Sequence, residues 1–131
     1  MALADHIVVM NKGRIEDQGP PQDVYSKPAT VFSASFMGES TILPADKFGQ
    51  SSPVAIRPEH IMIVAQGGNL GEAHVHSVVY QGSFKRVLAT STHNPAIVFT
   101  IRTDASNMIA AGEVVSLAVE PQHRIVLHHR A

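Results

Sequence analysis

The sequence predicts a mainly β protein: a small antiparallel β-barrel preceded by a β-hairpin and two short helices. Two observations support this fold class. The apolar runs are of strand length, and Gly, Pro and Asn residues interrupt them at short intervals. Such spacing is typical of a barrel or a sandwich, because a parallel sheet needs long crossover connections between its strands.

The clearest strand pair lies within residues 72–92. Residues 73–79 alternate in polarity, as a half-buried strand does, Gly82 interrupts the run, and residues 84–92 resume it. We therefore expect two antiparallel strands joined by a turn. Strict alternation would divide the first strand into two faces: Ala73, Val75 and Ser77 on one, His74, His76 and Val78 on the other.

The first forty residues predict a hairpin and two helices. Residues 6–10 and 14–18 are strand-like and flank residues 11–13, whose Asn and Gly suit a positive φ. Pro21 fits the first turn of a helix, since its missing N–H would be unpaired there anyway. Gly38 would end the second helix in the left-handed conformation.

The remaining chain predicts further short strands. The glycine-rich loop at residues 66–71 is expected to be the most mobile point. The predicted strands are residues 41–43, 54–57, 61–64, 96–102, 113–120 and 124–128.

Composition excludes several classes of function. The net charge is −1 and no basic cluster occurs, so a nucleic-acid partner is disfavoured. The chain has no cysteine, which rules out disulfides and thiolate metal sites. Its apolar runs are too short for direct membrane insertion, and its start lacks the pattern of a secretion signal, so we expect a cytoplasmic protein.

Several motifs carry a resemblance to a known family. The matching segments are ADHIVVMNKGRIE at residues 4–16, Gly19, Pro21, DVY at 23–25, PAT at 28–30, FMGE at 36–39, IRPEHI at 56–61 and YQGS at 80–83. In these, the chain resembles the end of bacterial ABC importer ATP-binding subunits of the sugar, polyamine and ferric-iron type. That group carries a C-terminal transport-associated OB (TOBE) domain, an OB-like barrel. Many relatives have threonine where Pro20 stands, so we expect the first helix to begin without a side-chain cap, at a cost of about 1 kcal/mol.

The resemblance implies a domain organisation and a parent protein. Residues 1–39 would be the end of the ATPase domain, and residues 40–131 the OB-like regulatory domain. The parent would hydrolyse ATP with magnesium and would contact membrane permease subunits at the inner face of the bacterial membrane. ATP hydrolysis needs a phosphate loop ending in Gly-Lys-Ser/Thr, and no glycine here precedes a lysine. We therefore expect a C-terminal fragment that binds no cofactor and is not itself an enzyme.

The candidate ligand or interdomain contacts are Arg57, Glu59, Ser83, Lys85 and Arg86. Ser83, Lys85 and Arg86 could form an anion site, but neighbouring strand positions point to opposite faces, which favours a solvated edge. Arg57 and Glu59 flank Pro58, and a structural ion pair or hydrogen bond there is favoured over ligand contact.

The histidines are candidate metal ligands. His74 and His76 share a predicted strand face, and His128 and His129 lie near the end of the chain. Two ligands without a third are weak evidence for zinc, so solvated or barrel-lining roles are favoured. No G-x-S-x-G motif supports a hydrolase triad.

The four phenylalanines outside the linker are expected to be core residues rather than a base-stacking platform. They are Phe32, Phe36, Phe84 and Phe99.

Two functions remain open at this point. The first is a regulatory and dimerisation domain, which would be a homodimer using apolar surface at residues 7–9 and at Val115, Leu117 and Val119. The second is a barrel that senses a small ligand, which would be an oxyanion, a sugar or a polyamine.

Overall fold

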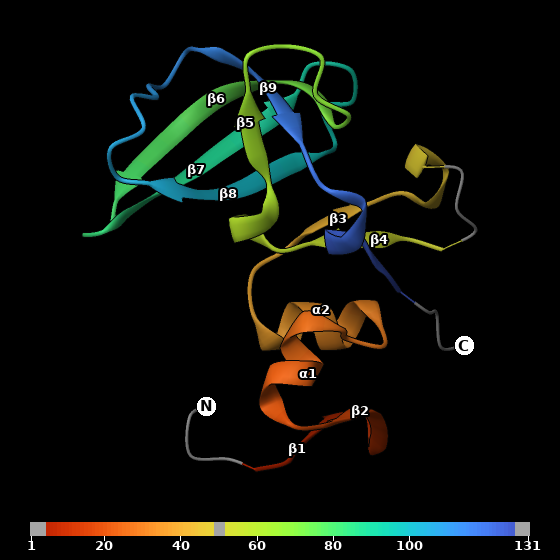
Figure 1. Ribbon diagram of the computed structural model, residues 1–131. Helices are drawn as coiled ribbons and strands as arrows, with labels where there is room; N and C mark the ends of the chain where they lie inside the picture. The colour runs from red at the N-terminus through yellow and green to blue at the C-terminus, as the bar shows by residue number, and fades with distance from the viewer. Residues whose placement is uncertain (1–4, 49–51, 128–131) are drawn as a thin grey trace. The chain divides into compact units, whose positions relative to one another are not determined.

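The computed structural model describes residues 5–48 and 52–127 (Figure 1). The expectation of a mainly β chain is confirmed. The strands form three separate sheets, and within the described residues no pairing closes a sheet into a ring, so the barrel stays a prediction. Contacts divide the chain into two compact units, residues 1–55 with 125–131 and residues 56–124. The expected boundary at residues 39 and 40 concerns the parent's domains and also stays a prediction.

The first unit contains a hairpin, two helices and a small sheet. Its elements are β1 (Ile7–Asn11), β2 (Arg14–Gly19), α1 (Pro21–Ser26), α2 (Val31–Met37), β3 (Thr41–Leu43), the 3₁₀ turn η1 (Ala45–Phe48), β4 (Val54–Ile56) and β10 (Ile125–Val126).

The hairpin forms as predicted, with a different turn. The residues with positive φ are Lys12 at 53° and Gly13 at 80°, whereas Asn11 is the last residue of β1. Two consecutive residues with positive φ match the twist of the flanking strands, which is why the turn falls at Lys12-Gly13.

The two helices pack on the hairpin and on each other. Pro20 caps α1 without a side-chain hydrogen bond, as expected. Thr30 caps α2, because its Oγ1 accepts from the Ser33 backbone N–H at 3.1 Å. Gly38 ends α2 with φ 158° and ψ −179°, an extended conformation instead of the left-handed one expected.

Strands β3, β4 and β10 form a sheet in the order β10-β4-β3, in which β10 and β4 are antiparallel. Ile125 pairs with Ala55, and Leu127 donates its backbone N–H to the Pro53 carbonyl. Ala34, Ala55 and Leu127 form a buried cluster, so α2 and the end of the described chain share one small core.

The second unit is a five-stranded antiparallel sheet with two 3₁₀ turns. The strand order is β5-β9-β6-β7-β8. The elements are η2 (Pro58–His60), β5 (Met62–Val64), β6 (Gly71–Tyr80), β7 (Phe84–Ser91), β8 (Val98–Asp104), β9 (Val114–Ala118) and η3 (Pro121–His123). The central β6–β7 pair of Figure 1 is the pair predicted from residues 72–92, while β8 begins and ends two residues later than expected.

A β-bulge in β6 corrects the expected faces. The register with β7 shifts between Val75 and Ser77, which makes His76 the extra residue. Beyond the bulge, Ser77 lies opposite Leu88 and Val78 lies opposite the fully buried Val87. Directly opposite residues share a face, so Val78 joins Val75 on the core face and Ser77 joins His74 on the outer face, the reverse of strict alternation.

The core lies on one face of this sheet. Val75, Ala89 and Phe99 are directly opposite one another on β6, β7 and β8, and each is at most 1% exposed. Leu117 and Val119 are also buried, at 0% and 2%. They are therefore not free apolar surface, which corrects the expectation that they were available for dimerisation.

Hydrogen bonds hold the loop before β6 against β9. The structure therefore does not support the expectation that this loop is mobile. The Asn69 side chain pairs with both backbone groups of Val119, at 2.9 Å each. Gly68 donates its N–H to Ser116 Oγ at 2.8 Å, and Leu70 donates to the Leu117 carbonyl. These hydrogen bonds hold the loop along β9.

No helix within the described ranges is long and apolar enough to cross a membrane.

Candidate functional site

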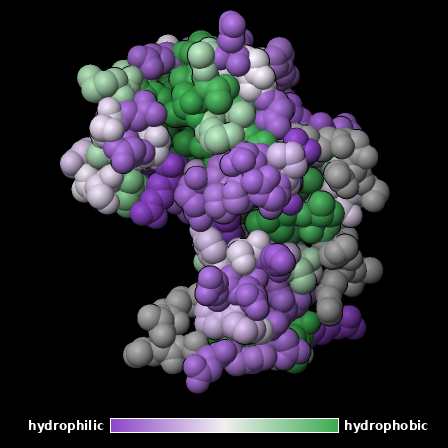
Figure 2. Space-filling model, viewed as in Figure 1, coloured by the Kyte–Doolittle hydropathy of each residue, from purple (hydrophilic) through white to green (hydrophobic). Residues whose placement is uncertain are grey.

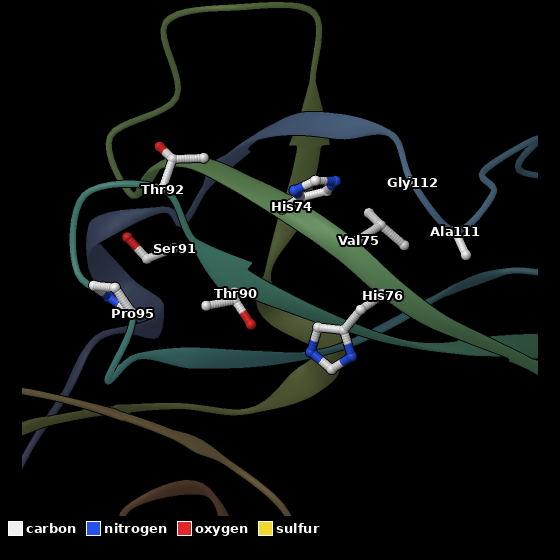
Figure 3. A pocket seen from close by; sticks show the side chains of 9 residues that line it. All are labelled: His74, Val75, His76, Thr90, Ser91, Thr92, Pro95, Ala111 and Gly112. Atoms are coloured by element: carbon white, nitrogen blue, oxygen red, sulfur yellow. The ribbon is translucent and has the colours of Figure 1, made fainter.

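The second unit carries a hollow of about 560 Å³, which we call the β6–β7 hollow (Figure 3). Its floor is formed by His74, Val75 and His76 of β6 and by Thr90 and Ser91 of β7. The turn after β7 and the loop before β9 contribute the rest: Thr92, Pro95, Ala111 and Gly112.

Backbone pairing fixes these residues relative to one another. His74 lies directly opposite Thr90 on β7 and opposite Val114 on β9. Gly112 donates its N–H to the Val75 carbonyl at 2.8 Å, which holds the loop before β9 against β6. The β6 and β7 residues of the hollow are therefore held by sheet pairing, and the loop before β9 is held against β6 by a backbone hydrogen bond.

The polar groups of the hollow are hydroxyl groups and imidazoles. Ser91 Oγ accepts from the backbone N–H groups of His93 and Asn94, both at 3.2 Å, so its own hydrogen can be donated elsewhere. Thr92 Oγ1 donates to the Glu72 carbonyl at 3.2 Å and keeps accepting capacity. The side chains of His74, His76 and Thr90 make no hydrogen bond to any other described residue.

The hollow holds no charged side chain of fixed sign, since Lys, Arg, Asp and Glu are all missing from its lining. Within residues 5–48 and 52–127, no group of three or more His, Cys, Asp or Glu side chains could hold a metal ion. His128 and His129 lie outside the described residues.

A second cluster joins the two 3₁₀ turns. The imidazoles of His60 in η2 and His123 in η3 are stacked, with ring centroids 3.8 Å apart and planes 11° from parallel. Burial and the neighbouring His123 lower the pKa of His60, while Glu59 and Glu120 act in the opposite direction. Both turns start with Pro after an extended residue and end with His, so the two local motifs match.

The structure separates the predicted anion-site residues. Lys85 and Arg86 take neighbouring positions on β7 and thus opposite faces, as expected. Lys85 Nζ donates to the Asn107 carbonyl at 2.7 Å, whereas Arg86 lies opposite Arg102. Ser83 is exposed in the turn. A joint site of Ser83, Lys85 and Arg86 is therefore not assembled.

The other expected contact residues differ in burial. Arg57 is 0% exposed, and Glu59 is exposed. A buried arginine is costly unless it is paired, so its burial favours a structural role for Arg57.

The phenylalanines also take different environments. Phe99 is buried, as expected, but Phe36 is 65% exposed, which corrects its assignment to the core. Phe36 stacks on Phe32 with centroids 6.0 Å apart, because the two lie one helical turn apart on α2. The Arg102 guanidinium lies over the Phe84 ring, 3.8 Å from the ring centroid, in a cation–π contact.

Apolar side chains also reach the surface in both units. On the hairpin, Val8, Met10 and Ile15 are 46%, 55% and 44% exposed, and Met10 lies directly opposite Ile15. Figure 2 shows green, apolar surface over β5 and β9 in the second unit, where Met62 is 40% exposed.

The TOBE domain family matches residues 54–127, and the chain belongs to this family. It is similar to the C-terminal regions of ABC importer ATP-binding subunits. It is 30% identical over 135 residues to the spermidine/putrescine import ATP-binding protein PotA of Bacillus thuringiensis strain Al Hakam, covering 98% of this chain and 39% of that protein. It is 38% identical over 89 residues to the sulfate/thiosulfate import ATP-binding protein CysA of Thermosynechococcus vestitus, covering 63% of this chain and 26% of that protein. The chain thus spans well under half the length of these relatives.

Sequence reasoning found part of these sites. The alternation predicts a shared strand face for His74 and His76, both of which line the hollow, but the loop residues that complete the hollow gave no signal. The His60–His123 stack was missed entirely. The repeated Pro-x-His triplets at residues 58–60 and 121–123 were its only trace in the sequence.

Proposed function

We propose that this chain is the regulatory and dimerisation region of an ABC importer ATP-binding subunit. The observation that carries the proposal is the combined match: the TOBE domain covers residues 54–127, and similarity to an import ATP-binding protein extends over 98% of the chain. Residues outside the TOBE match, including the hairpin and both helices, therefore have counterparts in that relative as well.

In this proposal ATP is bound and hydrolysed by the rest of the subunit. ATP and magnesium would be bound by the ATPase domain, because the sequence here holds no Gly-Lys phosphate loop. This region is then not itself an enzyme. The whole subunit would lie on the cytoplasmic face of the membrane and contact permease subunits there.

The hairpin supplies the physical support for an interface. Val8, Met10 and Ile15 are each more than two-fifths exposed, and Val8 and Met10 lie two residues apart on β1. A two-stranded hairpin is marginal alone and gains stability when its apolar side is covered. We propose that this surface packs on a second copy when the ATPase sheet is not there to cover it.

The test is light scattering of the chain over a range of concentrations. We expect the apparent mass to rise from monomer towards dimer as concentration increases. Met10→Glu and Ile15→Glu should shift this transition to higher concentration, because a charge on a buried apolar contact is costly.

Met108→Glu is the matched control, since Met108 is 90% exposed and lies outside the hairpin. A monomer at every concentration would contradict the proposal. So would equal self-association of the Met10→Glu and Met108→Glu variants.

A small-ligand sensing role is the second candidate, and the β6–β7 hollow is the observation that favours it.

A further inference from the structure

We propose that the β6–β7 hollow binds a small neutral polyhydroxylated molecule of sugar type. The proposal gives the sensing role a place and a ligand class, and it is independent of self-association through the hairpin. The proposed site lies at the β6 and β7 residues remote from the turn that joins these strands. Ser83, Lys85 and Arg86, which the sequence suggested as ligand contacts, lie at or next to that turn.

The hydrogen-bonding groups of the hollow match hydroxyl groups. A neutral imidazole has one donor and one acceptor nitrogen, and a hydroxyl group both donates and accepts. His74, His76 and Thr90 supply such groups with no described partner of their own. Thr92 can still accept, so donor and acceptor groups are both present around one space.

The charge of the lining separates this ligand class from ions. An oxyanion or a polyamine would enter a site with no side chain of opposite fixed charge, since none of the lining residues is Lys, Arg, Asp or Glu. Desolvating an unpaired charge is far costlier than desolvating hydroxyl groups that find partners. The hollow therefore does not suit sulfate or spermidine, which the names of the two relatives mention.

The bulge in β6 contributes to the arrangement. Bulges re-aim side chains and occur next to functional sites. His76 is the extra residue of this bulge, and Figure 3 shows its ring, with that of His74, among the residues around the hollow.

The apolar part of the lining and the size also fit. Pro95 and Ala111 can contact the C–H groups of a sugar ring. Small-molecule sites generally combine such apolar walls with a few placed polar groups and have volumes of roughly 300–1,000 Å³. The hollow, at about 560 Å³, lies within this range.

The experiment is amide NMR of the isotope-labelled chain at neutral pH, titrated with glucose, maltose and sorbitol up to about 50 mM. Sulfate and spermidine serve as charged comparison probes. We expect saturable shifts at residues 74–76, 90–92 and 111–112 with at least one neutral probe and with neither ion.

Two variants localise the binding. Thr90→Val keeps a β-branched strand residue but removes the hydroxyl, and His74→Ala removes the imidazole. Each should raise the Kd roughly three- to tenfold, the effect of one neutral hydrogen bond. His93→Ala is the control, because His93 is exposed in the adjoining turn and does not line the hollow.

Three results would overturn the proposal. The first is no saturable shift with any neutral probe. The second is binding of sulfate or spermidine at these amides in place of the neutral probes. The third is a Kd for Thr90→Val equal to that of the unmodified chain, which would place any sugar elsewhere.

Discussion

Acid should destabilise the second unit through the stacked pair of His60 and His123. Burial and His123 lower the pKa of His60 below 6.5, so the unfolded chain binds more protons than the folded chain in that range. The free energy of unfolding therefore falls as pH drops through 6.5, and the loss is complete only below the folded pKa of His60. Well above pH 6.5 both states are deprotonated at this residue and it contributes no pH dependence.

The geometry sets the size of the effect. With ring centroids 3.8 Å apart, two protonated imidazoles would repel each other. For unit charges about 4 Å apart, the repulsion is roughly 1 kcal/mol in bulk water and roughly 4 kcal/mol at an effective dielectric constant of 20. Both rings are half-buried and Glu59 and Glu120 offset part of the repulsion, so we expect about 1 to 2 kcal/mol.

The assay is urea unfolding at pH 8 and pH 5 with a double-mutant cycle. His60→Gln, His123→Gln and the double variant give the coupling energy between the two positions at each pH. We expect this coupling to become less favourable by about 1 to 2 kcal/mol at pH 5. His93→Gln, an exposed histidine in the same unit, should leave the acid dependence unchanged.

One outcome would refute the reasoning directly. If His123→Gln and the unmodified chain lose the same stability between pH 8 and pH 5, the stacked pair is not the source of the acid dependence.

Two further predictions concern local geometry. An added Cβ at Gly68 would lie 2.0 Å from the Leu117 carbonyl oxygen, so Gly68→Ala should destabilise by about 2 to 3 kcal/mol in urea unfolding, as overpacking against backbone does. Gly67→Ala should cost only about 1 kcal/mol, because it meets backbone strain at φ 71° but no neighbour within 4 Å, and an equal cost at both positions would contradict the close-approach argument. Thr30→Ala should destabilise the first unit by about 1 kcal/mol in thermal unfolding through loss of the α2 cap, whereas Thr30→Ser should nearly retain stability. No difference between the two Thr30 variants would argue against the cap.

The exposed Phe36 shows why local spacing left part of the fold open. Phe32 and Phe36 stack as their four-residue spacing predicts. Spacing alone, however, could not tell whether a neighbouring element covers the pair, and Phe36 remains 65% exposed. The reverse holds for Leu117, which looked like free surface on an alternating strand and is fully covered.

The candidate sites also combine features that local spacing predicts with features that depend on distant segments. The alternation of residues 73–79 predicts a shared strand face for His74 and His76, and the structure has both side chains exposed, with the bulge at His76 interrupting the alternation. The hollow is completed by the turn after β7 and the loop before β9. Its lining therefore brings together residues that are far apart in the chain.

By itself, the sequence determined the order of strands and helices, the central antiparallel pair, the uncapped start of α1 and the family of the chain. These depend on short-range rules: the period of apolar residues, the conformations open to Pro and Gly, and motifs of a few residues. Only the tertiary structure decided the bulge at His76, the stacking of His60 on His123, the burial of Leu117 and Val119, and the walls of the β6–β7 hollow. Each of these is set by which distant segment packs against the residue, and no local pattern encodes that choice.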